Sequence, residues 1–85
     1  MYAVVFNSNY GYEVEVNLFE EITEAKEFLK EDWKRYLDIE IKESVIPVAE
    51  GFCYCDEEFA KVQWANDDMA YWTICEAKKP ISECY

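Results

Sequence analysis

The feature that most constrains the fold is a change in hydrophobic periodicity along the chain. Residues 12–18 place apolar side chains at every second position, with Val14 and Val16 on the same side as Leu18, which predicts a half-buried β-strand. Over residues 22–37 the apolar side chains recur at steps of three and four, the period of an amphipathic helix. Alternation returns after residue 58, so the pattern predicts strands on both sides of one helix.

The expected fold class is α+β, a single domain over residues 1–85 with the element order ββαββ. An antiparallel sheet of about four strands, covered on one face by the helix, would bury the apolar positions of every element. Residues 80–85 should form a loosely held tail. The helix is expected over about residues 23–41, with Thr23 as its N-cap. Strands are expected at about residues 1–7, 12–18, 59–65 and 69–77. The predicted core consists of Val14, Val16, Phe28, Leu29, Trp33, Val62, Trp64, Trp72 and Ile74.

Polar clusters mark the connections between these elements. Residues 7–11 contain Gly11, which adopts positive φ at no steric cost, and they predict a hairpin between the first two strands. Residues 66–68, an Asn followed by two Asp, predict a second hairpin turn. Residues 52–55 are a candidate for a further short extended segment.

The net charge of −11, from 19 acidic and 8 basic residues, constrains the partners more than the fold. Direct binding to DNA, RNA or an anionic membrane requires Lys and Arg to neutralise phosphate, so the composition argues against all three. It favours a basic protein as partner. Solubility alone is the competing explanation, because many small domains are acidic.

The acidic residues are distributed unevenly. Residues 1–22 contain four acids and no base, residues 23–42 contain six acids and five bases, and residues 43–85 contain nine acids and three bases. The predicted helix is therefore close to neutral, and the predicted strands and loops carry most of the excess. Since solubility alone would place acids on every exposed face, this bias indicates an acidic binding surface on the sheet side.

The predicted binding surface lies on the sheet face that the helix leaves open. Glu13 and Glu15 share one side of a predicted strand, about 6.6 Å apart by strand rise, which is similar to the spacing of phosphates along a nucleic-acid strand. We expect acids from the loops and one exposed aromatic residue to extend this surface, because aromatic residues dominate binding hot spots. The candidate partner-binding residues are Glu13, Glu15, Asp56, Glu57, Glu58, Asp67, Asp68 and Tyr71.

Four cysteines and the absence of histidine limit the chemistry of the chain. Cys53, Cys55, Cys75 and Cys84 are weak candidates for a zinc site, because one residue separates the first two, where structural zinc sites use two to four. Cys53 and Cys55 should point to the same side of a strand. We expect free thiols in a cytoplasmic protein, since no basic segment followed by a long apolar stretch comes after Met1.

No catalytic signature stands out in the sequence. Without histidine the usual base for a Ser or Cys nucleophile is missing, and no phosphate-binding loop, dinucleotide motif or EF-hand loop is present. Paired carboxylates are numerous, but 85 residues leave little room for a concave site of about 300 Å³ beside the core. We therefore expect a protein that is not an enzyme and has no cofactor.

In length, acidity and αβ composition the chain resembles small acidic proteins encoded by phages and other mobile elements, of which anti-CRISPR proteins are the best-known group. Several anti-CRISPR proteins act as DNA mimics on Cas nucleases. The resemblance covers the whole-chain profile, involves no motif and assigns no residue. It implies a non-enzymatic inhibitor that occupies a basic nucleic-acid-binding surface of a partner such as a nuclease.

The sequence is also compatible with two other functions. A structural or adaptor module, or a homodimer, would bind through apolar sheet surface, by strand edges or by outer faces. Such binding would depend little on salt. A small metal protein would instead hold zinc through the cysteines.

Overall fold

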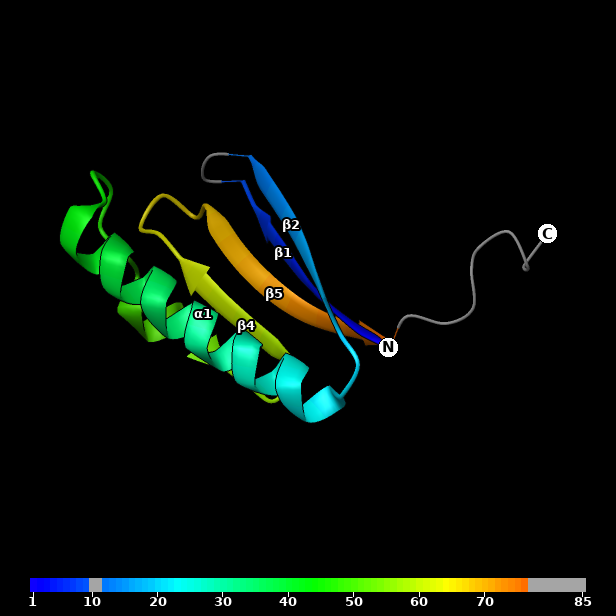
Figure 1. Ribbon diagram of the computed structural model, residues 1–85. Coiled ribbons are helices and arrows are strands. Elements are labelled where there is room, and N and C mark those ends of the chain that lie inside the picture. The colour runs from blue at the N-terminus through cyan, green and yellow to red at the C-terminus, as the bar shows by residue number, and fades with distance from the viewer. Residues whose placement is uncertain (10–11, 77–85) are drawn as a thin grey trace.

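The computed structural model describes residues 1–9 and 12–76, and its strands form one antiparallel sheet in the order β2-β1-β5-β4-β3 (Figure 1). One helix packs against one face of this sheet. The elements are β1 (Tyr2–Ser8), β2 (Glu13–Phe19), α1 (Ile22–Glu43), the short 3₁₀ helix η1 (Glu50–Phe52), β3 (Tyr54–Cys55), β4 (Phe59–Gln63) and β5 (Met69–Glu76). The predicted α+β class is confirmed.

The sheet has five strands where the sequence predicted about four. The additional strand is β3, which pairs with β4 through Tyr54 opposite Lys61 and Cys55 opposite Ala60. The central strand is β5, which pairs with β1 along seven residues. Strand β1 lies between β2 and β5 and is apolar on both sides, with Val4 on one side and Val5 on the other.

Helix α1 begins one residue earlier than predicted, and the prediction of Thr23 as its N-cap is wrong. The N-cap is Glu21, in a capping box in which the Glu21 backbone N–H donates to Glu24 Oε1 over 3.3 Å. This reciprocal arrangement satisfies helix-end donors that Thr23, already inside the first turn, does not reach. At the other end Ser44 is extended, and its backbone N–H donates to the carbonyl of Glu40 over 3.1 Å.

The core lies between α1 and the sheet face that carries the largest side chains. Of the predicted core residues, Leu29, Val62, Trp64 and Trp72 are fully buried, and Phe28, Trp33 and Ile74 pack partly buried against them. The Trp72 ring lies 4.7 Å from Phe6 and 5.4 Å from Tyr36, and its Nε1 donates to Asp32 Oδ2 over 2.9 Å. A buried indole N–H bonded in this way fixes the helix against the sheet.

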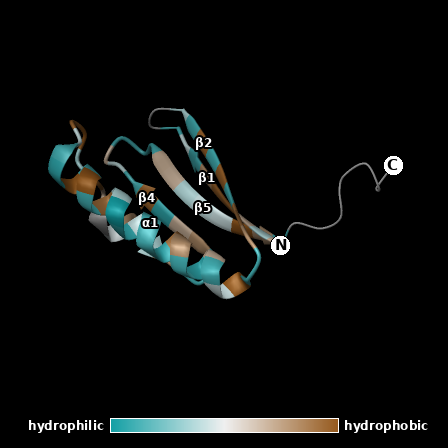
Figure 2. Ribbon diagram, viewed as in Figure 1, coloured by the Kyte–Doolittle hydropathy of each residue, from teal (hydrophilic) through white to brown (hydrophobic). Residues whose placement is uncertain are grey.

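The prediction that Val14 and Val16 belong to this core is wrong. Val16 pairs with Val5 of β1, and Val5 pairs with Thr73 of β5. Paired residues share a face, and this is the face opposite to Trp72. Hydrophobic and hydrophilic residues do alternate along β2, as Figure 2 shows. This alternation does not determine which side of the strand faces the helix.

The predicted turn at residues 66–68 is confirmed. The backbone N–H of Asp67 donates to the carbonyl of Trp64 over 3.0 Å, and Asn66 Oδ1 accepts from the backbone N–H of Asp68 over 3.1 Å. Asp67 has a φ of 72°, a left-handed conformation that Asp tolerates better than most residues. The predicted tail at residues 80–85 lies outside the described residues. Within the described part of the chain, no helix is long and apolar enough to cross a membrane.

Candidate functional site

The sheet presents two faces of different character. Phe6 and Trp72 pair directly, and both pack against Tyr36 of α1, so their side of the sheet is the helix face. We call the other side, which α1 leaves uncovered, the open face. Its residues are Ala3, Val5 and Asn7 of β1, Val14, Val16 and Leu18 of β2, Tyr54 of β3, Phe59, Lys61 and Gln63 of β4, and Met69, Tyr71, Thr73 and Cys75 of β5.

One half of the open face is an aliphatic row along β2. Val14, Val16 and Leu18 are 67%, 57% and 60% exposed. They are this exposed because β2 is an edge strand with one neighbour, which offers only Ala3 beside Leu18 and Val5 beside Val16. Adjoining apolar side chains that stay exposed are typical of interaction surfaces.

The other half of the open face is aromatic. The Phe59 ring centroid lies 5.8 Å from that of Tyr54 and 6.2 Å from that of Tyr71. The Lys61 ammonium lies 5.4 Å from the Tyr54 centroid in a cation–π contact. A hollow of about 420 Å³ adjoins Tyr71 at the end of the sheet near Tyr12. Lys61 is the one charged residue among the open-face positions of the described strands, so this face carries no carboxylate.

Glu13 and Glu15 lie on the helix face, so the expectation that they share a face with Tyr71 is wrong. Glu15 pairs with Phe6, and Glu13 pairs with Ser8. Both glutamates are nevertheless exposed. The reason is that β2 lies at the edge of the sheet, beyond the strands that α1 covers most fully (Figure 1).

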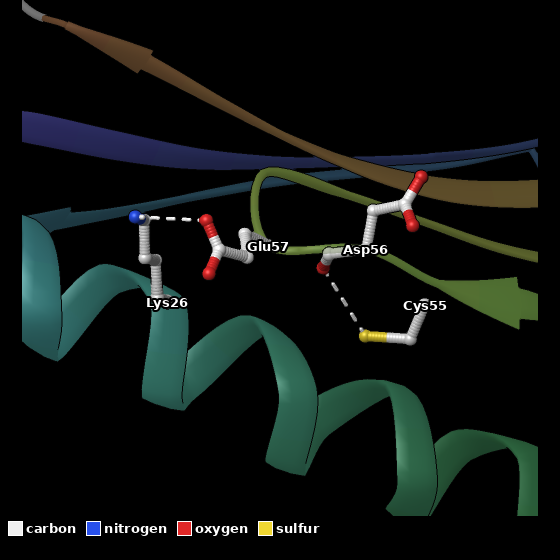
Figure 3. A network of polar contacts seen from close by, with 4 residues as sticks. All are labelled: Lys26, Cys55, Asp56 and Glu57. Carbon is white, nitrogen blue, oxygen red and sulfur yellow. Dashed lines mark hydrogen bonds and ion pairs between the residues drawn. The ribbon is translucent and has the colours of Figure 1, made fainter.

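Asp56, Glu57 and Glu58 form the turn between β3 and β4 (Figure 3). The turn is closed by the Asp56 backbone N–H, which donates to the carbonyl of Phe59 over 2.6 Å. Glu57 Oε2 lies 3.5 Å from Nζ of Lys26 on α1, and the Glu57 side chain is 86% exposed. An ion pair this exposed contributes about 0–1 kcal/mol, so the turn stays strongly acidic.

Asp67 and Asp68 lie in the turn between β4 and β5, at the other end of β4 from the Asp56 turn. The predicted carboxylates therefore form three separate groups, one on the helix face of β2 and one at each end of β4. Tyr71 alone lies on the open face. The structure does not bring the predicted partner-binding residues together on one surface.

A groove of about 870 Å³ lies between α1 and the segment that begins with Cys55. The expectation that the chain leaves little room for a concave site of about 300 Å³ is therefore wrong. The groove exists because β3 is only two residues long and leaves part of a 22-residue helix without a strand beside it. The residues that line it include Lys26, Lys30, Trp33, Cys55, Asp56 and Glu57.

The Cys55 thiol in this groove is poorly suited to act as a nucleophile. Burial raises its pKa above the ordinary value of 9.0, against an opposing effect of Lys30; Asp56 adds to the rise and Lys34 opposes it. Its Sγ lies 3.5 Å from the carbonyl oxygen of Asp56 (Figure 3). A thiol with a raised pKa stays protonated near neutral pH, whereas the thiolate is the reactive form.

The cysteines do not converge on one point. Cys53 and Cys55 both pack against the core, on the same side as expected, whereas Cys75 is exposed on the open face. In residues 1–9 and 12–76, no three Cys, Asp or Glu side chains are arranged to hold a metal ion. Cys84, the fourth predicted candidate, lies outside these residues.

The sequence did not indicate Val14, Val16 and Leu18 as binding residues, because Val14 and Val16 were expected in the core and Leu18 on the same side of the strand. A signal was present in β1, which is apolar on both sides. Strand β2, the hairpin partner of β1, has a single apolar row, and that row can lie on either face of the sheet. Because one helix covers only one face, the apolar row of β2 can remain on the uncovered face.

Comparison with known proteins assigns no role to these surfaces. No protein-family model matches the chain, and no curated protein or solved structure matches it at a significant level. The function is therefore argued from the geometry of the two sheet faces.

Proposed function

We propose that the chain is a non-catalytic protein-binding module that contacts its partner through the open face of the sheet. One observation carries the proposal: Val14, Val16 and Leu18 stand exposed beside an aromatic group on a face without carboxylates. In a chain with 19 acidic residues, a sheet face free of them is unexpected if every exposed surface serves solubility. An uncovered apolar face of this kind favours a partner that covers it.

The exposed side chains of this face offer apolar area whose burial favours binding. Full burial of an aliphatic side chain contributes about 1.5–3 kcal/mol. The three β2 side chains are more than half exposed, so a partner that covers them gains about 1–2 kcal/mol from each. Tyr54 and Tyr71, 45% and 36% exposed, add aromatic area of the type that dominates binding hot spots.

The acidic groups around the open face define the chemistry of the partner. Asp56, Glu57 and Glu58 lie at one end of β4, and Asp67 and Asp68 lie at the other. The partner that fits is a protein with an apolar centre and basic residues at its margin. In this arrangement the charges guide association and select the partner, while the apolar face supplies most of the affinity.

Nucleic-acid mimicry is the second candidate function, favoured by the exposed acidic turn at Asp56, Glu57 and Glu58. In this case the chain is an inhibitor that occupies a basic nucleic-acid-binding surface, as the resemblance to anti-CRISPR proteins implies. The two candidates differ in salt dependence. Binding by exposed charges is screened over about 8–10 Å at moderate ionic strength, whereas apolar burial is not.

The test compares variants of the open face and of the acidic turn. Tyr71→Ser removes an aromatic side chain from the open face, and a Glu57→Gln, Glu58→Gln double variant removes two charges from the turn between β3 and β4. Tagged wild type and variants are used to capture partners from one cell lysate, with elution in steps of rising salt. The affinity of each purified partner is then measured by calorimetry, and circular dichroism checks that each variant is folded.

The open-face proposal expects Tyr71→Ser to weaken the partner by at least about tenfold, the loss typical of a hot-spot residue, at both low and high salt. The double glutamine variant should change the affinity by less than about threefold. The reverse ranking, with release of the partner at moderate salt, would replace this proposal with mimicry.

A further inference from the structure

The outer edge of β2 is a backbone surface that can accept another strand. β2 pairs with β1 on one side, and on the other side it ends the sheet that residues 1–9 and 12–76 form. Residues 13–16 are exposed on both faces. The strand contains no proline or lysine and its pairing with β1 has no bulge. It therefore lacks three of the features that prevent an edge strand from pairing with another chain, and Glu13 and Glu15 are its only charged residues.

Two backbone hydrogen bonds determine which groups of β2 point outward. The N–H of Asn9 donates to the carbonyl of Met69 over 3.1 Å, so the odd-numbered residues of β1 turn their backbone groups toward β5. The N–H of Ile74 donates to the carbonyl of Glu58 over 3.0 Å, so the even-numbered residues of β5 turn their backbone groups away from β1. The odd-numbered residues of β5 therefore turn theirs toward β1, which agrees with the first bond. The even-numbered residues of β1 thus bond to odd-numbered residues of β2. The backbone groups that remain for the outer edge are those of Val14, Val16 and Leu18.

We propose that a second copy of the chain binds this edge, with the two β2 strands antiparallel and Val16 opposite Val16 at the two-fold axis. Val16 is the midpoint of β2, so this register overlaps the whole strand. It pairs Val14 with Leu18 of the second copy, and the outward N–H and C=O groups of both strands meet one another. The two sheets then become one continuous sheet.

The distribution of charge along β2 favours this register over those whose axis lies nearer the start of the strand. With Val16 at the axis, Glu15 faces Asn17 of the second copy and Glu13 faces Phe19. An axis through Glu15 would instead place two Glu15 carboxylates opposite each other. An axis through Val14 would place Glu13 opposite Glu15. Like charges directly opposite each other destabilise a strand pair.

The dimer would also extend the open face. A two-fold axis through paired edge strands is perpendicular to the sheet, so both copies turn their open faces to the same side. Val14, Val16 and Leu18 of the two copies then form one continuous aliphatic row across the junction. This inference does not depend on which protein binds the open face, since it rests on the edge of β2 alone.

The net charge gives the dimer a distinctive salt dependence. Two chains that each carry −11 repel each other, and salt screens this repulsion. The dissociation constant of the dimer should therefore fall as salt rises. Binding of a basic partner changes with salt in the opposite direction, so the two associations are distinguished by one titration.

The first experiment is sedimentation velocity of the full chain from about 1 μM to about 1 mM, the range of weak to moderate association. Wild type should change from monomer to dimer over this range. Val16→Pro removes an outward N–H that β1 does not use, so it should weaken the dimer by at least about tenfold with unchanged circular dichroism. Val16→Lys, which places two cations opposite each other at the axis, is the second blocking variant.

The register is tested by Asn17→Lys, which places a lysine opposite Glu15 of the second copy twice in each dimer. Opposite charges at paired positions contribute roughly 0.2–1 kcal/mol each, so the dimer should tighten by about 2- to 30-fold. Val45→Lys is the control, because it makes the same change in charge at a position that is 94% exposed in the connection after α1. It should tighten the dimer less than Asn17→Lys does.

Three results would overturn the proposal. The first is a wild-type chain that stays monomeric throughout, even if an extended peptide of another protein binds the edge. The second is a dimer that both Val16 variants leave intact, which would place the contact elsewhere. The third is an equal effect of the two lysine variants, which would mean that net charge and not the register controls association.

Discussion

The Cys55 thiol lies where the short strand β3 meets the groove beside α1, and its surroundings make it a structural rather than a reactive group. Its pKa is raised because burial disfavours the thiolate, and the nearby cations Lys30 and Lys34 do not reverse this effect. The same environment that prevents activation creates a pH dependence of folding. A group whose pKa differs between the folded and unfolded states makes stability depend on pH.

For Cys55 the protonated thiol is favoured in the folded state, so its contribution to stability is complete below the ordinary pKa of 9.0. It is lost as pH rises above that value and through the raised pKa of the folded state. Cys55→Ala should therefore show a shallower fall in the free energy of unfolding above about pH 9 than wild type. Denaturant titrations at several pH values under reducing conditions measure this difference.

The control for this prediction is Cys75→Ala, because Cys75 is exposed on the open face. That variant should keep the wild-type slope of stability against pH. Parallel pH profiles for wild type and Cys55→Ala would contradict the assigned environment of the thiol.

At the scale of an element, β2 has two edges that differ in hydrogen bonding and two faces that differ in polarity. One edge bonds to β1, and the other has no partner strand among the described residues. One face carries Val14, Val16 and Leu18, and the other carries Glu13 and Glu15. The strand is held in the sheet mainly by its backbone bonds to β1, because most of its side chains are exposed.

Two proline substitutions separate the two edges of β2. Glu15→Pro removes a backbone N–H directed to β1, and this should reduce the free energy of unfolding by about 1–3 kcal/mol, because the partner carbonyl on β1 loses its donor. Val16→Pro removes an N–H directed to the free edge, and it should cost less than about 1 kcal/mol in the monomer. Urea unfolding at a low protein concentration measures both. Equal losses for the two variants would mean that the assignment of inner and outer backbone groups is incorrect.

At the scale of the whole molecule, the excess of negative charge opposes the compact state. Among the described residues two ion pairs form, Lys26 with Glu57 and Arg35 with Asp32. Both have at least one partner that is largely exposed, and such pairs contribute little. Self-repulsion is therefore the dominant electrostatic effect on folding.

This balance predicts that salt stabilises the fold. The melting temperature of Val16→Pro, chosen to exclude dimerisation, should rise by several degrees between about 10 mM and about 150 mM NaCl, as the screening length shortens. Differential scanning calorimetry measures it. A variant with Asp67→Asn and Asp68→Asn, which removes two charges from one turn, should show a smaller rise. A melting temperature that falls with salt would mean that attractive pairs outweigh the repulsion.

The sequence alone determined the elements and the fold class. The change of period after Leu18 predicted a helix between strands, and residues 66–68 predicted the turn between β4 and β5 that the structure contains. These features are local, because they depend on side-chain spacing and turn chemistry within a few residues. The large residues Trp64 and Trp72 were also placed correctly, since each has too much apolar area to remain exposed in a small domain.

Only the tertiary structure decided which side of β2 meets the helix. Alternation divides a strand into two rows, but the choice between them depends on the strand's place in the sheet and on its register with its neighbours. The edge position of β2 leaves Val14 and Val16 on the open face and Glu13 and Glu15 on the helix face. The same pairing separated the acidic residues that the sequence had grouped, because strand order and register are set by contacts between residues far apart in the chain.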